Sequence, residues 1–235
     1  MNPLEEYKNK RDFSKTSEPV QNKGTSKQKK RSEDDPLIFV IQRHEARNLH
    51  YDFRLEMEGV LKSWAVPKGP SLNPSDKRLA IMVEDHPYDY HSFEGSIPKG
   101  NYGAGEVTIW EKGVYEPLNK VEGKDNETIL LEGLKKGSLK IIMYGTKLNG
   151  EFALIKMKTA KEENAWLLIK HKDKYAVEEN YDAEDHLLID ASKDKPIISS
   201  KKNIKLNEYI KPMLATTGKE PFNDDKWIFE IKWDG

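Results

Sequence analysis

The chain has 235 residues, of which 34% are charged and 36% hydrophobic, and its formal net charge is -1. This length allows one domain with extensions or two small domains, and the charge excludes a polycation, so nucleic acid would need a local basic surface. Cysteine is absent, which excludes disulfides and thiolate metal sites, and no apolar run approaches the roughly 20 residues that cross a bilayer.

Residues 1–36 are predicted to form a flexible N-terminal arm that is partly disordered. The stretch QNKGTSKQKKRSEDDP is almost free of apolar side chains, so burial cannot fix its conformation. Its basic residues at 27–31 could touch phosphates, although composition favours a solvated linker. Tyr7 and Phe13 are the side chains able to anchor the earlier part of the arm to a domain.

Residues 37–175 are predicted to form a mainly β domain. Short runs rich in Val, Ile, Trp, Tyr and Phe recur there, separated by turn residues, as expected for strands. Many short strands with tight turns favour either a β-sandwich or a small closed barrel. The runs are LIFVIQRH, LHYDFRLEM, VLKSWAVP, RLAIMVED, GEVTIWEKG, SLKIIMYG, EFALIKMK and AWLLIKHK.

Local signals predict two hairpins and one helix within this domain. The hairpin turns are expected at Gly59 and at Asn149-Gly150. The segment NETILLEGLKKG is expected to be a short helix with its N-cap at Asn126 and its end at Gly137. Residues 176–208 are polar and predict a linker with one short ordered turn, and residues 209–235 begin a new element.

The strand LHYDFRLEM has two chemically different faces. Side chains alternate along a strand, so His50, Asp52, Arg54 and Glu56 share one face, while the intervening Tyr, Phe, Leu and Met pack on the other. In a barrel, the space that the polar side chains share would be the lumen or its mouth.

A divalent metal site is predicted where His44, His50 and Asp52 converge. Two imidazoles and one carboxylate suit Mn²⁺, Zn²⁺ or Fe²⁺ and leave positions open for water or substrate. Arg54, one strand step further, suits bidentate capture of a phosphate. The alternative is a solvated strand face with an ion pair, but three metal- or phosphate-binding groups on one face favour a site.

A second polar cluster follows a strand predicted over Leu79–Val83. His86 and Tyr90 are expected on a loop at the end of this strand, where His86 could contact a phosphate oxygen or protonate a leaving alkoxide. The glycine-rich stretch FEGSIPKGNYGAGEV lacks the Gly-Lys-Ser/Thr ending of a P-loop, and its glycines are interpreted as turns at a barrel rim. Lys68 and Arg78 would add positive charge nearby.

The segments VIQRHEARNLHYDFRLEMEGVLKSWAVPKGPS, VEDHPYDYHSFEGSIPKGNYGAGEVTIW and WLLIKHKD closely resemble the 3'-phosphoesterase domain of bacterial DNA ligase D, over about residues 7–175. The resemblance implies a compact β-barrel with short flanking helices in a cytoplasmic bacterial or archaeal enzyme of nonhomologous end joining. It implies Mn²⁺-dependent trimming of DNA 3' ends: a phosphodiesterase step removes a terminal ribonucleoside, and a phosphomonoesterase step then leaves a 3'-OH. The implied partners are DNA 3' ends carrying a ribonucleotide or phosphate, Ku, and the polymerase and ligase domains.

The resemblance also implies roles for individual residues. The family's metal ligands match His44, His50 and Asp52, and its phosphate-contacting residues match Arg54, His86 and Tyr90. Further residues important to the family match Gln42, Lys68, Arg78, Arg11, Asp12, Phe13 and Glu18. The chain departs from the family at Ser17, where the family has proline. Because several of the matching residues lie within residues 1–36, the arm is also expected to be partly docked.

The last segment, KPMLATTGKEPFNDDKWIFEIKWDG, resembles the opening of an ATP-dependent DNA ligase domain, with Lys232 as the nucleotidylated lysine. We expect the chain to be the N-terminal part of a longer ligase D and to perform no ligation itself. Two other classes stay open: a non-catalytic module that binds DNA ends, and a ligase fragment that labels itself with AMP at Lys232.

Overall fold

The structure is a computed structural model, and it describes residues 3–20, 37–158 and 163–187. All of these lie within the compact unit Met1–Ser199. The basic cluster at 27–31, the expected ligase-like segment 209–235 and Lys232 fall outside the described residues. No helix in the described part of the chain is long and apolar enough to cross a membrane.

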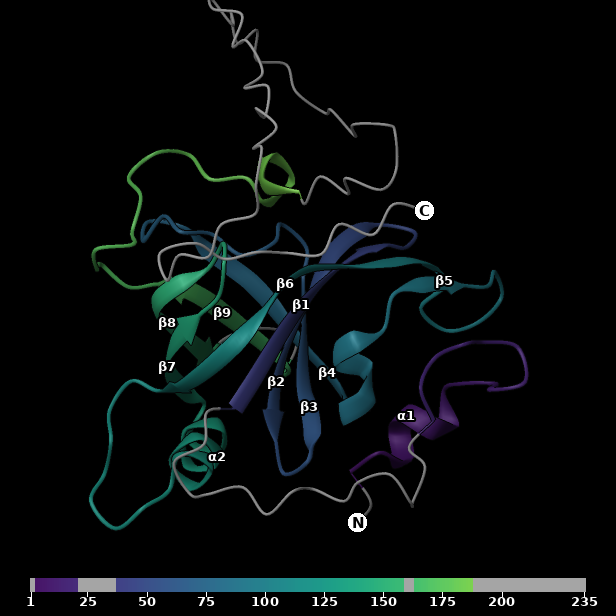
Figure 1. The fold of residues 1–235 in the computed structure, drawn as a ribbon, viewed down its shortest axis with the longest axis horizontal. Helices are drawn as coiled ribbons and strands as arrows, with labels where there is room; N and C mark the ends of the chain where they lie inside the picture. Colours follow the sequence, from purple (N-terminus) through teal and green to yellow (C-terminus); the bar gives the residue numbers. More distant parts are fainter. Residues whose placement is uncertain (1–2, 21–36, 159–162, 188–235) are drawn as a thin grey trace, which may run out of the picture. The chain divides into compact units, whose positions relative to one another are not determined.

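Eight antiparallel strands form a closed barrel (Figure 1). They are paired in the order β1-β2-β3-β4-β9-β8-β7-β6, and a pairing between β1 and β6 closes the ring. Each of the eight predicted runs forms one of these strands. Because the ring is closed, the barrel alternative is confirmed and the sandwich alternative is wrong. The strands are β1 (Leu37–Glu45), β2 (Leu49–Met57), β3 (Val60–Val66), β4 (Lys77–Pro87), β6 (Gly105–Pro117), β7 (Ser138–Tyr144), β8 (Asn149–Lys156) and β9 (Ala165–Lys170).

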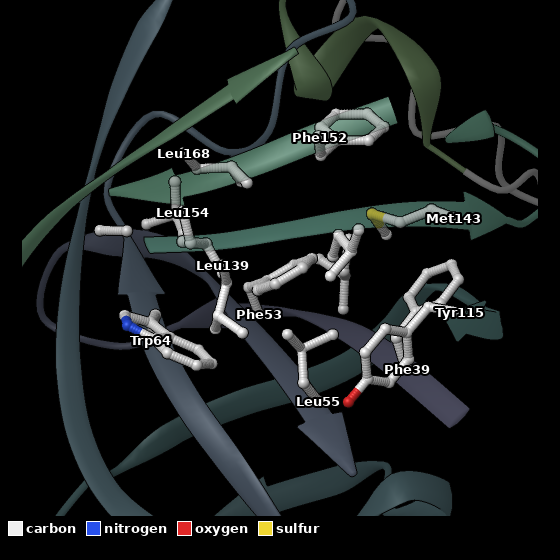
Figure 2. Close-up of a cluster of buried hydrophobic side chains, with 14 of the residues drawn as sticks. Phe39, Phe53, Leu55, Trp64, Tyr115, Leu139, Met143, Phe152, Leu154 and Leu168 are labelled. Atoms are coloured by element: carbon white, nitrogen blue, oxygen red, sulfur yellow. The ribbon is translucent and has the colours of Figure 1, made fainter. Parts of the chain in front are cut away.

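The barrel interior is a continuous apolar core to which all eight strands contribute (Figure 2). On β2 the contributing side chains are every second residue from Tyr51 to Met57, as the alternation predicts. Trp64 packs between Phe53 and Trp166, with ring centroids 6.3 and 5.9 Å away. Burial of so many aromatic and branched side chains is the main source of stability in this fold.

The short elements surround the barrel. They are α1 (Glu5–Asn9), η1 (Tyr88–Ser92), β5 (Gly95–Ile97), α2 (Asn126–Lys136) and η2 (Ala183–His186). The α2 helix lies where predicted, but its N-cap is Asp125, whose carboxylate accepts a hydrogen bond from the Thr128 amide, rather than Asn126. Gly137 ends the helix in the left-handed conformation, with φ of 73°.

The two predicted hairpins have different outcomes. β2 and β3 meet at Glu58-Gly59, both with positive φ, which confirms the turn at Gly59. The turn at Asn149-Gly150 is wrong, because Asn149 already pairs with Tyr144 and the turn occupies residues 145–148. Gly150 serves a different purpose: a Cβ there would lie 2.2 Å from the Asp173 carboxylate.

The segment before residue 188 packs against one end of the barrel. It contains the short turn η2, as expected, and Ala183 is part of the apolar core. Glu184 accepts two hydrogen bonds of 2.8 Å from Arg43 and one from the Tyr51 hydroxyl. α2 lies at the opposite end, beside the β2–β3 hairpin (Figure 1).

Candidate metal and phosphate site

The polar face of β2 lies on the outside of the barrel wall. The prediction that it faces the lumen or its mouth is wrong, because aromatic and aliphatic side chains fill the lumen. A second apolar cluster lies against the outer wall and joins α1, η1 and β5 to β1, β3 and β6; it contains Leu4, Tyr7, Val40, Val60, Leu61, Tyr90, Phe93, Ile97 and Val107. With this cover in place Asp52 and Arg54 are buried, while His50, nearer the end of the strand, is partly buried.

His44, His50 and Asp52 converge on the outer wall. His44 lies directly opposite His50 in the β1–β2 pairing, and Asp52 is the next outward residue on β2. His44 Nδ1 is 3.4 Å and His50 Nε2 is 3.7 Å from the Asp52 carboxylate. One ligand atom of each lies within 4.8 Å of the others. Three ligands at about 2.0–2.2 Å from one ion need nearly this spacing.

Hydrogen bonds to backbone carbonyls orient both imidazoles. His44 Nε2 donates to the Gly103 carbonyl at 2.8 Å, and His50 Nδ1 donates to the Asn48 carbonyl at 2.9 Å. A carbonyl oxygen only accepts, so in the neutral rings His44 Nδ1 and His50 Nε2 carry the lone pairs, and both atoms face Asp52. Metal-binding histidines are typically held by such a bond from the second ring nitrogen. The donor set therefore fits a divalent cation.

Asp52 is an ionised carboxylate in this environment. Burial alone would raise its pKa, but the Arg54 guanidinium, joined by His44 and His50 when their rings are protonated, outweighs burial and holds the pKa of Asp52 below its usual range. Together with the two imidazole lone pairs, it offers the two-histidine, one-carboxylate set typical of transition-metal sites with open positions.

Arg54 is buried beside the metal-ligand candidates. Its guanidinium donates to Gln42 at 2.8 Å, to Ser63 at 2.9 Å and to the Asp52 carboxylate at 3.0 Å. Gln42 in turn donates to the carbonyls of Tyr90 and Phe93, at 3.1 and 2.7 Å. The expected Gln42 therefore both orients Arg54 and ties the η1 segment to the barrel wall.

His86 lies inside β4, not on the expected loop, because the strand runs to Pro87 rather than ending at Val83. Its Nδ1 donates to the Glu84 carbonyl at 2.9 Å, and its Nε2 is 3.2 Å from an Arg11 nitrogen. Burial, Arg54 and Arg11 hold the pKa of His86 well below its usual range. The neutral ring thus accepts from Arg11 at Nε2, and protonating a leaving group would require Arg11 to move away.

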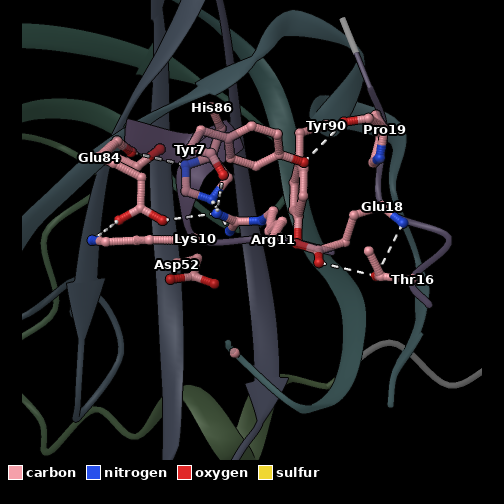
Figure 3. A network of polar contacts seen from close by, with 12 residues as sticks. Tyr7, Lys10, Arg11, Thr16, Glu18, Pro19, Asp52, Glu84, His86 and Tyr90 are labelled. Carbon is pink, nitrogen blue, oxygen red and sulfur yellow. Dashed lines mark hydrogen bonds and ion pairs between the residues drawn. The ribbon is translucent and has the colours of Figure 1, made fainter. Parts of the chain in front are cut away.

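The N-terminal arm reaches into the site through Arg11 (Figure 3). Arg11 donates to Glu18 at 2.8 Å and to Glu84 at 3.0 Å, and its guanidinium lies 3.9 Å from the centre of the Tyr7 ring. The Tyr90 hydroxyl, on η1, also donates to Glu18, at 3.0 Å. The expected partial docking of the arm is therefore seen in residues 3–20.

Three predicted residues lie apart from this network. Asp12 is exposed, and Lys15 and Ser14 lower its pKa to about 2. Lys68 is exposed just after β3. Arg78 donates to the Asp76 carboxylate and the Tyr181 carbonyl, and so holds the segment before η2. These contacts do not reach the metal-ligand candidates, and the roles implied for the three residues stay predictions.

Sequence reasoning missed Glu84, Lys10 and the Gly103 carbonyl. Glu84 is buried and accepts from both Arg11 and Lys10, which offset the effect of burial and lower the pKa of Glu84. Its position two residues before His86, on the same strand, was an available signal. A backbone carbonyl carries no sequence signal at all.

The family comparison matches residues 42–156 to the DNA ligase D 3'-phosphoesterase domain. The chain is 40% identical to the multifunctional non-homologous end joining protein LigD of Pseudomonas aeruginosa, over 99% of this chain and 28% of that protein. The LigD proteins of Mycolicibacterium smegmatis and Mycobacterium tuberculosis are 37% and 36% identical, over 99% of this chain and 25% of each relative. The chain thus spans about a quarter of the length of these relatives.

Proposed function

Because residues 42–156 belong to the DNA ligase D 3'-phosphoesterase domain family, we propose that this chain trims DNA 3' ends in a Mn²⁺-dependent reaction. The phosphodiesterase activity removes a 3'-terminal ribonucleoside, and the phosphomonoesterase activity removes the remaining 3'-phosphate. The product is a 3'-OH end suited to ligation during double-strand break repair.

The observation that carries this proposal is the position of a buried arginine beside a three-residue metal-ligand set. The ligand atoms of His44, His50 and Asp52 lie within 4.8 Å of one another, and Arg54 contacts the Asp52 carboxylate. A divalent ion bound there would offset phosphate charge and polarise phosphorus. Its identity as Mn²⁺, rather than Zn²⁺ or another transition metal, is part of the proposal.

The surrounding residues have distinct tasks in this reaction. Arg54, fixed by Gln42 and Ser63, meets a second phosphate oxygen and stabilises the charge that grows on it. Arg11, at His86 Nε2, lies where an entering phosphate would draw it away and leave His86 free to contact that phosphate. Tyr90 supplies a further hydroxyl beside them. Water fits as the nucleophile on an end with one ribonucleotide. Where the preceding sugar is also a ribose, its 2'-OH fits as an alternative nucleophile, and water would then open the resulting 2',3'-cyclic phosphate.

The partners in this proposal are DNA 3' ends, recognised through a local cationic surface because the whole chain has a net charge of -1. Binding to the phosphate backbone should weaken as salt rises. The relatives are named for non-homologous end joining. Cooperation with Ku and with polymerase and ligase domains, in a bacterial cytoplasm, is proposed for this chain by that relationship.

The test is cleavage of a primer-template that ends in one 3'-ribonucleotide, with divalent metals compared and products resolved by length and end chemistry. His50→Ala should lower the rate by about 10²-fold or more, since even the partners of metal ligands are worth 10–100-fold. The matched control is His91→Ala, because His91 Nδ1 also contacts a backbone carbonyl, that of Tyr88 at 2.8 Å, outside the ligand set. Wild-type turnover by His50→Ala would contradict the proposal.

The same assay separates catalysis from simple end binding. A non-catalytic module would retain salt-sensitive DNA binding and yield no metal-dependent product from either the ribonucleotide or the 3'-phosphate substrate. That result in the wild-type protein would replace the enzyme proposal with the binding-module alternative.

A further inference from the structure

An exposed aromatic side chain lies next to the candidate site. Tyr102, in the turn between β5 and β6, is 48% exposed, the highest value among the large hydrophobic side chains of the described residues. Tyrosine is enriched at binding interfaces, because it combines a large apolar ring with a polar hydroxyl.

The backbone around Tyr102 is firmly held against the metal-ligand set. The Gly103 carbonyl accepts the hydrogen bond from His44, and a Cβ on Gly103 would lie 3.7 Å from the His44 ring. The turn is closed by hydrogen bonds from Asn101 to Pro98 and from Ala104 to Asn101, both 3.2 Å. Gly105 packs so closely on β1 that a Cβ there would lie 2.4 Å from the Glu45 carbonyl oxygen. Tyr102 is thus fixed one residue from the carbonyl that orients His44.

Two cations lie over this ring, and Glu84 accepts a hydrogen bond from each of them. Lys10 Nζ lies 4.9 Å and the Arg11 guanidinium 5.6 Å from the ring centre. Tyr144 is nearly as exposed, at 46%, but its hydroxyl donates to the Glu116 carboxylate on the far strands β6 and β7. An exposed ring flanked by cations is the combination with which proteins hold single-stranded nucleic acid, by base stacking and phosphate attraction.

We propose that Tyr102 stacks on the nucleobase of the 3'-terminal nucleotide and so positions the DNA end over the metal-ligand set, with Lys10 close to the adjoining backbone. This inference rests on the proposed function, which supplies the DNA end. Tyr102 is therefore a substrate-binding residue that contacts the terminal nucleobase. Every base has a π face, so the contact is independent of base identity.

The test pairs two substrates with three variants. The substrates are a primer-template with a normal 3'-terminal ribonucleotide and one with an abasic 3'-terminal ribose. Tyr102→Ala should raise both KM and Kd for the normal end by about tenfold. Tyr102→Phe keeps the ring and should bind like wild type. Tyr144→Ala is the control for loss of an exposed tyrosine away from the site.

The decisive comparison is on the abasic end. Wild type should bind the abasic end more weakly than the normal end by the same factor of about ten. Tyr102→Ala should bind the abasic end as well as wild type does, because the base that the ring would stack on is absent. An equal loss on both substrates would overturn the inference, since it would mean that the ring only holds Lys10 and Arg11 in place. Anisotropy measured with EDTA reports stacking without catalysis, so inactivity of the wild type would overturn the proposed function and leave this comparison readable.

Discussion

Both faces of β2 are largely buried, although His50 on the outer face is only partly so, and the two faces contribute differently to the protein. Phe53, on the inner face, is 0% exposed, and Arg54, on the outer face, is 2% exposed. Burial of the phenyl ring releases apolar surface from water and stabilises the barrel. Burial of the guanidinium is costly, and the hydrogen bonds to Gln42, Ser63 and Asp52 serve to offset that cost.

The two faces also differ in what covers them. The inner face meets other strands of the same barrel, whereas the outer face is covered by η1 and by the N-terminal arm, whose Arg11 pairs with Glu84 across 73 positions of sequence. The contrast indicates that the inner side chains of β2 mainly stabilise the barrel, whereas the outer side chains form the candidate site. Changes on the inner face should unfold the protein, and changes on the outer face should leave a folded but impaired protein.

The largest effect on stability is expected from Phe53→Ala. Removing a buried phenyl ring leaves a cavity and costs about 3–5 kcal/mol, a large share of the 5–15 kcal/mol that stabilises a typical domain. Urea denaturation followed by circular dichroism measures the change. If the loss were below about 1 kcal/mol, the inner face would not be the stabilising layer.

Arg54→Lys probes the neighbouring position on the outer face. Lysine keeps the positive charge, but its single ammonium group lacks the planar set of donors with which a guanidinium can bind Gln42, Ser63 and a phosphate together. We expect kcat for the 3'-ribonucleotide substrate to fall about 10²–10³-fold. The free energy of unfolding should fall by only about 1–3 kcal/mol, from polar partners left unpaired. A larger loss of stability than in Phe53→Ala, or undiminished turnover, would erase the difference between the faces.

How far the sequence predicts this molecule depends on the range of the interactions. Alternation along a strand is local, so both faces of β2 and all eight barrel strands could be predicted from the sequence. The period of two does not say which face meets the lumen, and the polar face was assigned to the wrong side. That choice is made by the whole ring of strands, whose pairings join distant segments.

Tertiary contacts also explain the local errors. Glu84 and His86 are typical of a strand end, yet β4 continues to Pro87 because β3 pairs with it there, and Arg11 partners both side chains. Asn149-Gly150 is a strong turn signal, but Gly150 is used to admit the Asp173 carboxylate next to the Glu151 amide. Resemblance to a family pointed to Arg11 and Glu18, which composition alone left undecided and which contact His86 and Tyr90 in the structure.

The smallest expected effect is a pH dependence of the free energy of unfolding, which arises from the buried His86. The pKa of His86 is lowered in the folded protein by burial and by Arg54 and Arg11. In the unfolded chain it returns to about 6.5, so below that pH the unfolded state binds a proton that the folded state does not. The metal-free protein should therefore lose stability as pH falls through about 6.5 towards the folded pKa, by at most about 1.4 kcal/mol per pH unit from this group.

His86→Gln isolates that contribution, because glutamine can keep a hydrogen bond to Arg11 and does not titrate. The measurement is the difference in free energy of unfolding between wild type and variant, from about pH 7.5 to about pH 5, in EDTA. The difference should shift in favour of the variant as pH falls. Phe53→Ala, which removes no titrating group, should keep a constant difference from wild type over the same range. If the free energies of unfolding of wild type and His86→Gln ran parallel with pH, His86 would be protonated as easily in the folded protein as in the unfolded chain. Burial would then not be what keeps His86 neutral.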